Sequence, residues 1–279
     1  MYIDTHAHLN YPDKYGDMDD LLSRIAAAGV DTVVNVGWDL PSSALAAQMA
    51  ERYAPAQAAD AGEGPAPRPR LFFAAGFHPS DCLKMQDKDL GELAGLLAAP
   101  GGVAVGEIGL DYHYEGTDAP AQKRAFAAQL ELAHALSLPV IIHSRDAAAD
   151  TLQLLKDNRA KLACGGVMHC FSGSPETAKE YLKLGLYISF AGPVTFKNAR
   201  RLDEAAKIVP RDRILAETDS PYLAPEPHRG TMNTPANVGL IYQKLAQLRG
   251  EDVQQLAAQI GANARALFAG IGKPARTGA

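Results

Sequence analysis

The chain has 279 residues, 47% of them hydrophobic, and a formal net charge of −5 at pH 7. This length and composition fit one large globular domain or two modest ones with a substantial apolar core. The acidic balance argues against a broad basic surface that tracks a long duplex, but it is compatible with short or single-stranded nucleic acid held at a cationic metal site. No apolar run reaches the length of a membrane span.

The chain's three cysteines are an odd number without the spacing of a disulfide framework. Candidate functional residues begin at His6, which leaves no room for a signal peptide before them. Together these observations predict a soluble protein of a reducing compartment, most simply the cytoplasm.

Short β-branched or apolar runs alternate with longer segments of helical periodicity. This alternation is typical of βα units and a parallel sheet. The predicted strands are 2–5, 32–37, 71–75, 103–106, 139–143, 166–169, 186–190 and 213–216. Eight such strands in a chain of this length predict one TIM-type (β/α)₈ barrel, so residues 1–279 are expected to form a single domain.

Several helix boundaries can be predicted directly. Asp118 and Pro120 begin a helix whose apolar face continues to position 136. Thr234 is predicted to cap another helix, with Pro235 at its first position. Two further short helices are expected after the last strand, at 252–260 and 262–268.

Two segments lack this periodicity. Residues 54–70 are rich in Ala, Pro and Gly and predict a flexible surface loop. Because this loop leads into the start of a strand, we expect it on the face opposite the strands' carboxyl ends. Residues 270–279 are expected to form a disordered tail.

Six side chains of the types that bind metals lie at the ends of predicted strands. They are His6, His8, Glu107, His143, His169 and Asp219. The carboxyl ends of all barrel strands meet at one face, and residues spaced i, i+2 on a strand point the same way, so we expect the six to converge. Any one of these histidines alone is more often a structural or surface residue. Together, four imidazoles and two carboxylates suit two adjacent divalent metals that share a carboxylate.

Six longer motifs contain or flank these residues. They are DTHAHL (4–9), GFHP (76–79), GEIGLDY (106–112), PVIIHSRDA (139–147), HCFSG (169–173) and ETDSPYL (217–223). In this order and across essentially the whole chain, they resemble the TatD family of metal-dependent deoxyribonucleases, a branch of the amidohydrolase-like barrels. The segment 263–268 resembles the family's closing helix.

The resemblance implies a ligand assignment. His6, His8, Glu107 and Asp219 would bind one metal, while Glu107, His143 and His169 would bind the second, with Glu107 bridging. Asp219 would also take the proton from the attacking water. Zn, Mn, Mg, Co and Ni are all compatible with this mixture of imidazole and carboxylate ligands.

Four residues near these motifs are candidates for contact with a substrate. Arg145 and Arg229 follow predicted strands and could bind a phosphate, unless they pair with nearby carboxylates. His78 is expected to contact the substrate or transfer a proton, the alternative being a structural hydrogen bond. Ser172 could donate to a phosphate oxygen, or it could cap the next helix.

Three acidic residues are expected to support the ligands rather than bind metal. Asp4 and Glu217 share strand parity with ligands two residues on, so they could orient imidazoles. Asp111 lies beyond Glu107 and is expected in an orienting or structural role.

The predicted reaction is phosphodiester hydrolysis of DNA by metal-activated water. A barrel mouth is a pit rather than a groove, which favours single-stranded or frayed ends and exonucleolytic action. The chain has no aromatic and basic stripe for tracking a long single strand. The alternatives are hydrolysis of an aminoacyl-tRNA ester or a phosphomonoester, and a non-catalytic metal-binding barrel. The sequence leaves the oligomeric state open, and a monomer is compatible with it.

Overall fold

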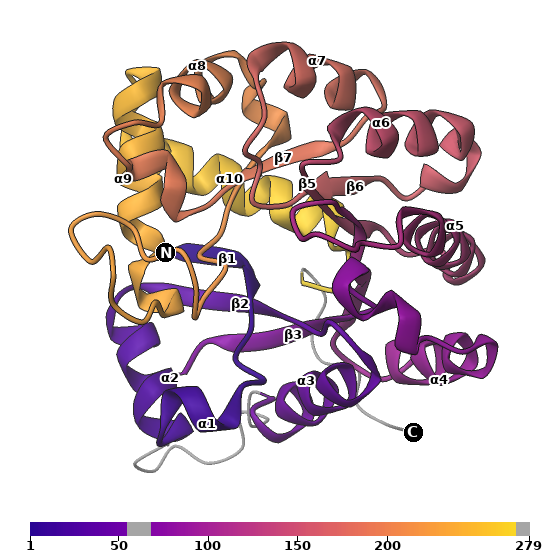
Figure 1. Ribbon diagram of the computed structural model, residues 1–279. Helices are drawn as coiled ribbons and strands as arrows, with labels where there is room; N and C mark the ends of the chain where they lie inside the picture. Colours follow the sequence, from indigo (N-terminus) through magenta and orange to yellow (C-terminus); the bar gives the residue numbers. More distant parts are fainter. Residues whose placement is uncertain (55–67, 272–279) are drawn as a thin grey trace.

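The computed structural model describes residues 1–54 and 68–271, and these residues form the predicted barrel (Figure 1). Eight parallel strands pair in sequence order from β1 to β8. One parallel bridge between Ala7 and Ser220 joins β1 to the segment after β8, so the barrel is nearly closed. The strands are β1 (Tyr2–Ala7), β2 (Val30–Val36), β3 (Arg70–Ala75), β4 (Gly102–Asp111), β5 (Val140–Arg145), β6 (Gly166–Met168), β7 (Tyr187–Phe190) and β8 (Ile214–Ala216).

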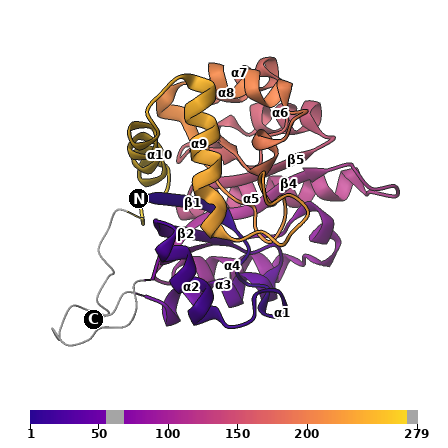
Figure 2. The same cartoon turned by 90° about the vertical axis from the view of Figure 1, so that its left-hand side faces the viewer.

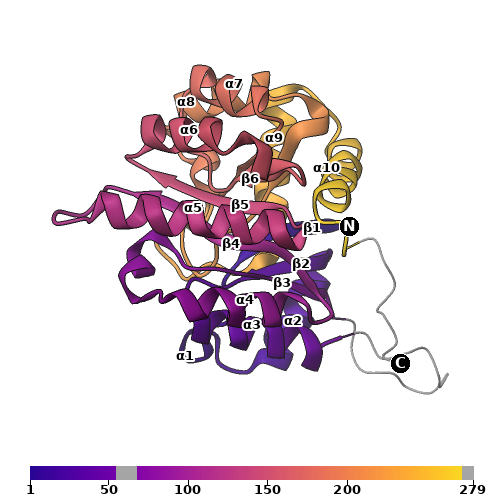
Figure 3. The same ribbon diagram turned by 90° about the vertical axis from the view of Figure 1, so that its right-hand side faces the viewer.

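Helices surround the sheet, as the views from two further sides show (Figures 2 and 3). They are α1 (Pro12–Tyr15), α2 (Met18–Ala27), α3 (Leu40–Arg52), α4 (Asp87–Leu97), α5 (Ala119–Leu136), α6 (Ala148–Asp157), α7 (Pro175–Lys183), α8 (Arg200–Ile208), α9 (Val238–Arg249) and α10 (Val253–Leu267). Short 3₁₀ turns lie at η1 (Pro79–Lys84), η2 (Arg159–Leu162), η3 (Gly192–Thr195), η4 (Arg211–Arg213) and η5 (Pro235–Asn237). No helix among the described residues is long and apolar enough to cross a membrane.

Three strands run further at their carboxyl ends than the sequence predicts, and β1 does so by two residues, to Ala7. β4 extends to Asp111 and β5 to Arg145, and the two remain paired to their last residues. The extra length of β4 carries Ile108 and Leu110, which are fully buried, so apolar burial continues past Glu107. As a result Glu107 lies inside β4 rather than at its end, and His143 lies inside β5.

The helix predictions have mixed outcomes. α5 begins where predicted, with the Asp118 side chain accepting a hydrogen bond from the Ala121 amide. The two expected C-terminal helices are one helix, α10, because buried residues at helical spacing continue through Gly261. Thr234 precedes the 3₁₀ turn η5 and makes no side-chain cap hydrogen bond, so the α9 helix itself begins only at Val238.

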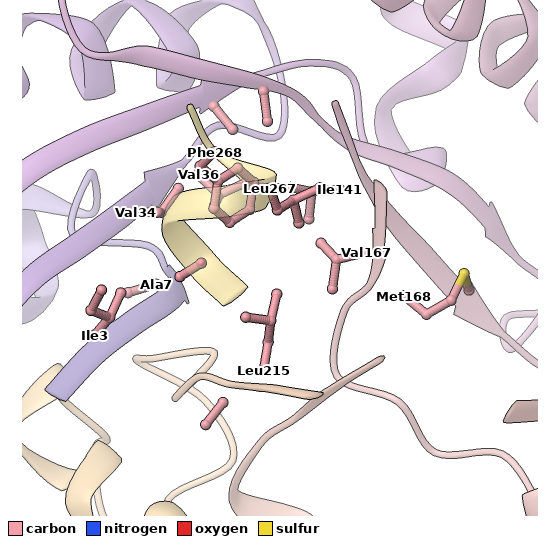
Figure 4. Close-up of a cluster of buried hydrophobic side chains, with 14 of the residues drawn as sticks. Ile3, Ala7, Val34, Val36, Ile141, Val167, Met168, Leu215, Leu267 and Phe268 are labelled. Carbon is pink, nitrogen blue, oxygen red and sulfur yellow. The ribbon is translucent and has the colours of Figure 1, made fainter. Parts of the chain in front are cut away.

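The end of the barrel away from the strands' carboxyl ends is closed by α10. The Asn263 side-chain amide donates to the carbonyl of Ile214, the first residue of β8. Phe268, just after α10, belongs to the same buried cluster as Val34, Ile141 and Val167 (Figure 4). This closure leaves the carboxyl ends of the strands as the face available for a site. The expected loop at 54–70 and the tail at 270–279 fall mostly outside the described residues.

Tyr242 of α9 forms hydrogen bonds to the backbone at the start of β1. In the described structure this part of β1 is not paired with β8. The Tyr242 hydroxyl donates to the Ile3 carbonyl over 2.9 Å and accepts from the Ile3 amide over 3.3 Å, all within the core. Tyr242→Phe would leave both backbone groups buried without a partner, and we expect the free energy of unfolding to fall by about 1–3 kcal/mol. Urea denaturation would measure this loss. Tyr2→Phe is the control, because the Tyr2 hydroxyl has no hydrogen bond within the described chain, and an equal loss there would contradict the assignment.

Candidate metal centre

The site begins on β1, where the i, i+2 spacing turns His6 and His8 toward the same cavity. Both side chains are buried, and their Nε2 atoms lie 3.2 Å apart. The other ring nitrogen of His8, Nδ1, lies 2.8 Å from the Val36 carbonyl at the end of β2. Since a carbonyl only accepts, this contact places the His8 proton on Nδ1 and leaves Nε2 free to bind a cation.

Glu107 lies between two groups of imidazoles. Its Oε1 is 2.8 Å from both His143 Nδ1 and His169 Nε2. Its Oε2 is 3.4 Å from His6 Nε2 and 3.7 Å from His8 Nε2. Each carboxylate oxygen therefore faces a different histidine pair, which is the arrangement a bridging ligand needs.

Asp219 completes the group around His6 and His8. Its Oδ1 lies 3.5 Å from His8 Nε2 and 3.8 Å from His6 Nε2. The residue follows β8 in a left-handed conformation, with φ at 54°, and its amide donates to the His6 carbonyl. Asp tolerates this conformation better than most residues, so the backbone turn itself favours Asp or Asn here.

The donor set fits divalent cations. Two nitrogens bound about 2.1 Å from one tetrahedral ion lie about 3.4 Å apart. The His6–His8 pair and the His143–His169 pair have nitrogen separations of 3.2 and 3.3 Å. The ligand atoms also fall into compact groups, one of His6, His8 and Asp219 and another of His6, Glu107 and His169. Five donor residues around the shared Glu107 carboxylate can thus hold two ions at the strands' carboxyl ends.

The carboxylates and imidazoles of the site shift each other's pKa values. Burial alone would raise the pKa of Glu107, but the imidazoles of His169 and His78 and hydrogen bonds from His143 and His169 hold that pKa well below its usual range. Burial opposes protonation of His169, yet Glu107 and Glu217 raise its pKa well above the ordinary value. A proton therefore occupies the His169 imidazole that a cation would bind.

Metal binding should consequently release protons. Because the pKa of His169 is raised, its imidazole is protonated at neutral pH, and a cation on Nε2 must displace that proton. We expect the apparent metal affinity to weaken as pH falls from this pKa, by about tenfold per pH unit for each proton displaced. Calorimetric titration in buffers of different ionisation enthalpy would count the protons. An affinity independent of pH would contradict this prediction.

Two of the three supporting carboxylates contact ligand rings. Asp111 Oδ2 lies 3.0 Å from His143 Nε2, and Glu217 Oε1 lies 3.1 Å from His169 Nδ1. These contacts fix the orientation of both rings, and in each ring the opposite nitrogen points toward Glu107.

The prediction that Asp4 orients an imidazole is wrong. Asp4 accepts hydrogen bonds from the amide and hydroxyl of Thr218 and from the His6 amide, so it ties β1 to β8 instead.

His78 faces the same cavity from the loop after β3. Its Nδ1 accepts the Ser80 amide hydrogen, which leaves the proton of a neutral ring on Nε2. Nε2 lies 3.6 Å from Glu107 Oε1. Burial lowers the pKa of His78 to about 4, so the ring stays neutral at physiological pH and can donate a hydrogen bond into the site.

The other candidate substrate residues lie at the rim. Arg145 and Arg229 are exposed, and their guanidinium groups lie over the rings of Tyr114 and Phe196. Within the described residues neither arginine forms the carboxylate ion pair weighed above; Asp146 pairs with His113 instead. Both guanidinium groups therefore keep hydrogen-bonding capacity for a ligand.

Ser172 is also at the rim and does not cap the next helix. Ser174 does so, accepting from the Thr177 amide. Ser172 lines a pocket of about 310 Å³ together with His169, Gly173 and Arg201. This pocket therefore begins directly beside a candidate metal ligand.

Three aromatic residues at the mouth escaped the sequence reasoning. Tyr11, Trp38 and Tyr222 come from the segments after β1, β2 and β8, and their rings lie beside His8. Each follows a strand's carboxyl end by only a few residues, which is the signal that could have identified them. How closely the three rings approach one another depends on the conformation of the loops that carry them. Hydrophobic periodicity in the sequence does not predict that conformation.

Known proteins resemble this chain along nearly all of its length. The family model described as TatD related DNase matches residues 3–269. An uncharacterized metal-dependent hydrolase, YabD of Bacillus subtilis, is 40% identical over 96% of this chain and 99% of its own. A protein of Citrobacter koseri named 3′-5′ ssDNA/RNA exonuclease TatD is 37% identical over 90% of this chain and 93% of its own.

A solved structure shares the fold closely. The crystal structure of YJJV, a TatD homolog from Escherichia coli, superposes with a TM-score of 0.86 at 31% identity, covering 96% of this chain and 98% of that one. The match therefore extends over sequence, fold and the whole barrel that carries the candidate centre. The chain belongs to the TatD-related DNase family.

Proposed function

We propose that this protein is a divalent-metal-dependent phosphodiesterase that removes nucleotides from single-stranded or frayed DNA ends. The observation that carries the proposal is Glu107, whose two oxygens face two separate histidine groups. Such a pair of adjacent cation positions suits in-line displacement at phosphorus.

Family membership supports the reaction class. Members of this family are metal-dependent hydrolases that act on ester bonds, and relatives covering most of this chain are named 3′-5′ ssDNA/RNA exonucleases. We extend that name to this chain as the proposed substrate and direction of degradation.

The residues can be assigned roles in this reaction. We assign His6, His8, Glu107 and Asp219 to one ion and Glu107, His143 and His169 to the other, drawn from Zn, Mn, Mg, Co and Ni. When bound, the ions would supply an activated water and neutralise charge on the phosphate.

The remaining steps fall to the protein. The side chain of Asp219 is ionised. The hydrogen bond from His8 and the charges of nearby imidazoles lower its pKa by more than burial raises it. The Asp219 carboxylate can therefore accept the proton of the attacking water. His78 donates from Nε2 to a phosphate oxygen, and its neutral state makes it a poor source of a full proton at neutral pH.

The rim residues would position the substrate. Arg145 and Arg229 carry exposed guanidinium groups that can bind phosphates on either side of the scissile one. Ser172 can donate its hydroxyl hydrogen beside His169. Arg145 ends β5, and Ser172 and Arg229 lie in the segments after β6 and β8, so the substrate would enter from above the barrel mouth as a splayed strand.

The test uses metal-stripped protein and single-stranded DNA oligomers labelled at the 3′ or the 5′ end. We expect no cleavage without metal, and stepwise shortening from the 3′ end when one of the candidate ions is restored. An aminoacyl ester and a phosphomonoester are run in parallel. Hydrolysis of either of these with intact DNA, despite metal binding, would overturn the proposal in favour of another ester.

A further inference from the structure

Three aromatic side chains form a cluster at one side of the barrel mouth. The rings of Tyr11 and Trp38 are stacked, with centroids 4.3 Å apart and planes 18° from parallel. Tyr222 stands perpendicular to Tyr11 at 6.2 Å, and its hydroxyl donates to the Tyr11 hydroxyl over 3.0 Å. We refer to Tyr11, Trp38 and Tyr222 as the aromatic cluster.

The aromatic cluster adjoins the candidate metal centre. The ring of His8 lies 5.5 Å from that of Trp38 and 6.5 Å from those of Tyr11 and Tyr222. A flat group bound on the cluster would therefore lie near a phosphate held beside His8 Nε2, as the base and the phosphate of one nucleotide lie near each other.

Core packing explains only part of the cluster, because Tyr11 packs against the hydrophobic core but the three rings are not fully covered. Tyr222 is 48% exposed, and Tyr11 and Trp38 are partly exposed. Large aromatic rings at a site mouth leave apolar faces in water unless a ligand covers them. In the stacked pair, each ring also keeps one face turned away from its partner.

Backbone hydrogen bonds hold Trp38, one residue of the stacked pair in the aromatic cluster, in position. The Trp38 amide donates to Ser42 Oγ at the start of α3, and its carbonyl accepts from the His78 amide. These bonds connect Trp38 to the loop that carries His78. A preformed aromatic surface costs little conformational entropy on binding.

The chemistry of the cluster selects a flat, uncharged partner. Two acidic side chains whose charges act on Tyr11 are already engaged, Asp39 as the cap of α3 and Asp81 in an ion pair with Lys84. The guanidinium groups that suit phosphates, Arg145 and Arg229, lie over other rings, those of Tyr114 and Phe196. Stacking on aromatic rings is the sequence-tolerant way in which proteins hold single-stranded bases.

We propose that the aromatic cluster binds the nucleobase of the nucleotide whose phosphate lies at the metal centre. This inference rests on the proposed nuclease function and adds a base-stacking subsite to it. It makes Trp38 a positioning residue, since the ring holds the base and not the reacting atoms.

Trp38 is the only tryptophan of the chain, so tryptophan fluorescence reports on the cluster alone. We expect dAMP to quench this fluorescence saturably in the metal-loaded enzyme, with excitation at wavelengths where the base does not absorb. 2-Deoxyribose 5-phosphate, which has the same sugar and phosphate without the base, should cause no quenching. An equal response to both ligands, or none to either, would overturn the proposal.

Kinetics on two oligomers provides an independent test. One oligomer ends in a normal nucleotide and the other in an abasic analogue at the same end. Trp38→Ala should raise KM about tenfold for the first and leave KM for the second unchanged, while Trp38→Phe should stay near wild type on both. Equal damage on both oligomers would mean that the cluster only shields the metal centre.

The nuclease function and the base-stacking subsite can be disproved separately. If the wild-type enzyme cleaves neither oligomer under any metal condition, the nuclease function is wrong. If it cleaves both oligomers and Trp38→Ala does not distinguish them, the nuclease function stands and the subsite is wrong. Should Trp38→Ala not fold, the fluorescence titration of the wild-type protein decides the question by itself.

Discussion

Glu107→Gln is expected to remove nearly all hydrolysis and to lower bound metal at both positions. Each oxygen of the carboxylate faces one histidine pair, so one neutral amide would weaken both groups at once. An amide oxygen carries no charge to balance a divalent cation, and the amide nitrogen cannot bind one at all. We expect a rate loss of about a thousandfold or more, measured on labelled single-stranded DNA.

The matched control is Glu92→Gln, the same chemical change at an exposed position of α4. It should leave both metal content and rate unchanged. Metal content is read by elemental analysis after dialysis, and circular dichroism checks that the fold is kept. A Glu107→Gln enzyme with full activity and two bound ions would refute the shared-carboxylate assignment.

Asp219→Asn is expected to slow turnover by about a hundred- to ten-thousandfold while the ion at Glu107, His143 and His169 remains bound. The variant keeps the shape of the side chain and removes its ability to accept a proton. Asn also tolerates the left-handed backbone, with φ at 54°, so the turn after β8 should persist. Single-turnover rates and metal content measured together separate the chemical step from metal loss.

Asp146→Asn is the control for this variant. Asp146 has the same positive φ of 54°, but its side chain is exposed and pairs with His113 rather than with a candidate ligand. Surface ion pairs of this kind contribute little, so the free energy of unfolding should not change measurably. Asp146 also lines the pocket beside Ser172, so any change in rate should be small compared with that of Asp219→Asn. If Asp219→Asn turns over like the wild-type enzyme, another group must accept the proton.

The sequence predicts the fold and the approximate position of the site for one physical reason. Parallel strands joined by helices must all point the same way, so residues that follow the strands meet at one end. His6, His169 and Asp219 illustrate this, since each lies at or just after the end of its strand and the three are brought into one cavity.

The observed element boundaries differ from the predicted ones where contacts between distant segments outweigh the local sequence pattern. β4 and β5 extend past the predicted ends because each continues to pair with the other, and a single strand's sequence does not show that pairing. Gly261 suggests a helix break, but α10 continues through it because its apolar face covers the end of the barrel.

The residue types of the site, and the end of the barrel at which they gather, can be predicted from the sequence alone. The folded barrel sets which oxygen of Glu107 faces which histidines. It also directs Asp4 to Thr218 and the His6 amide but Glu217 to the His169 ring, and it brings Tyr11, Trp38 and Tyr222 together beside His8. The chemistry of a side chain, and the side of a strand on which it lies, are local properties that can be predicted from the sequence. Orientation within a cavity depends on barrel closure and loop conformation, which are set by contacts between residues as far apart as Asp4 and Thr218.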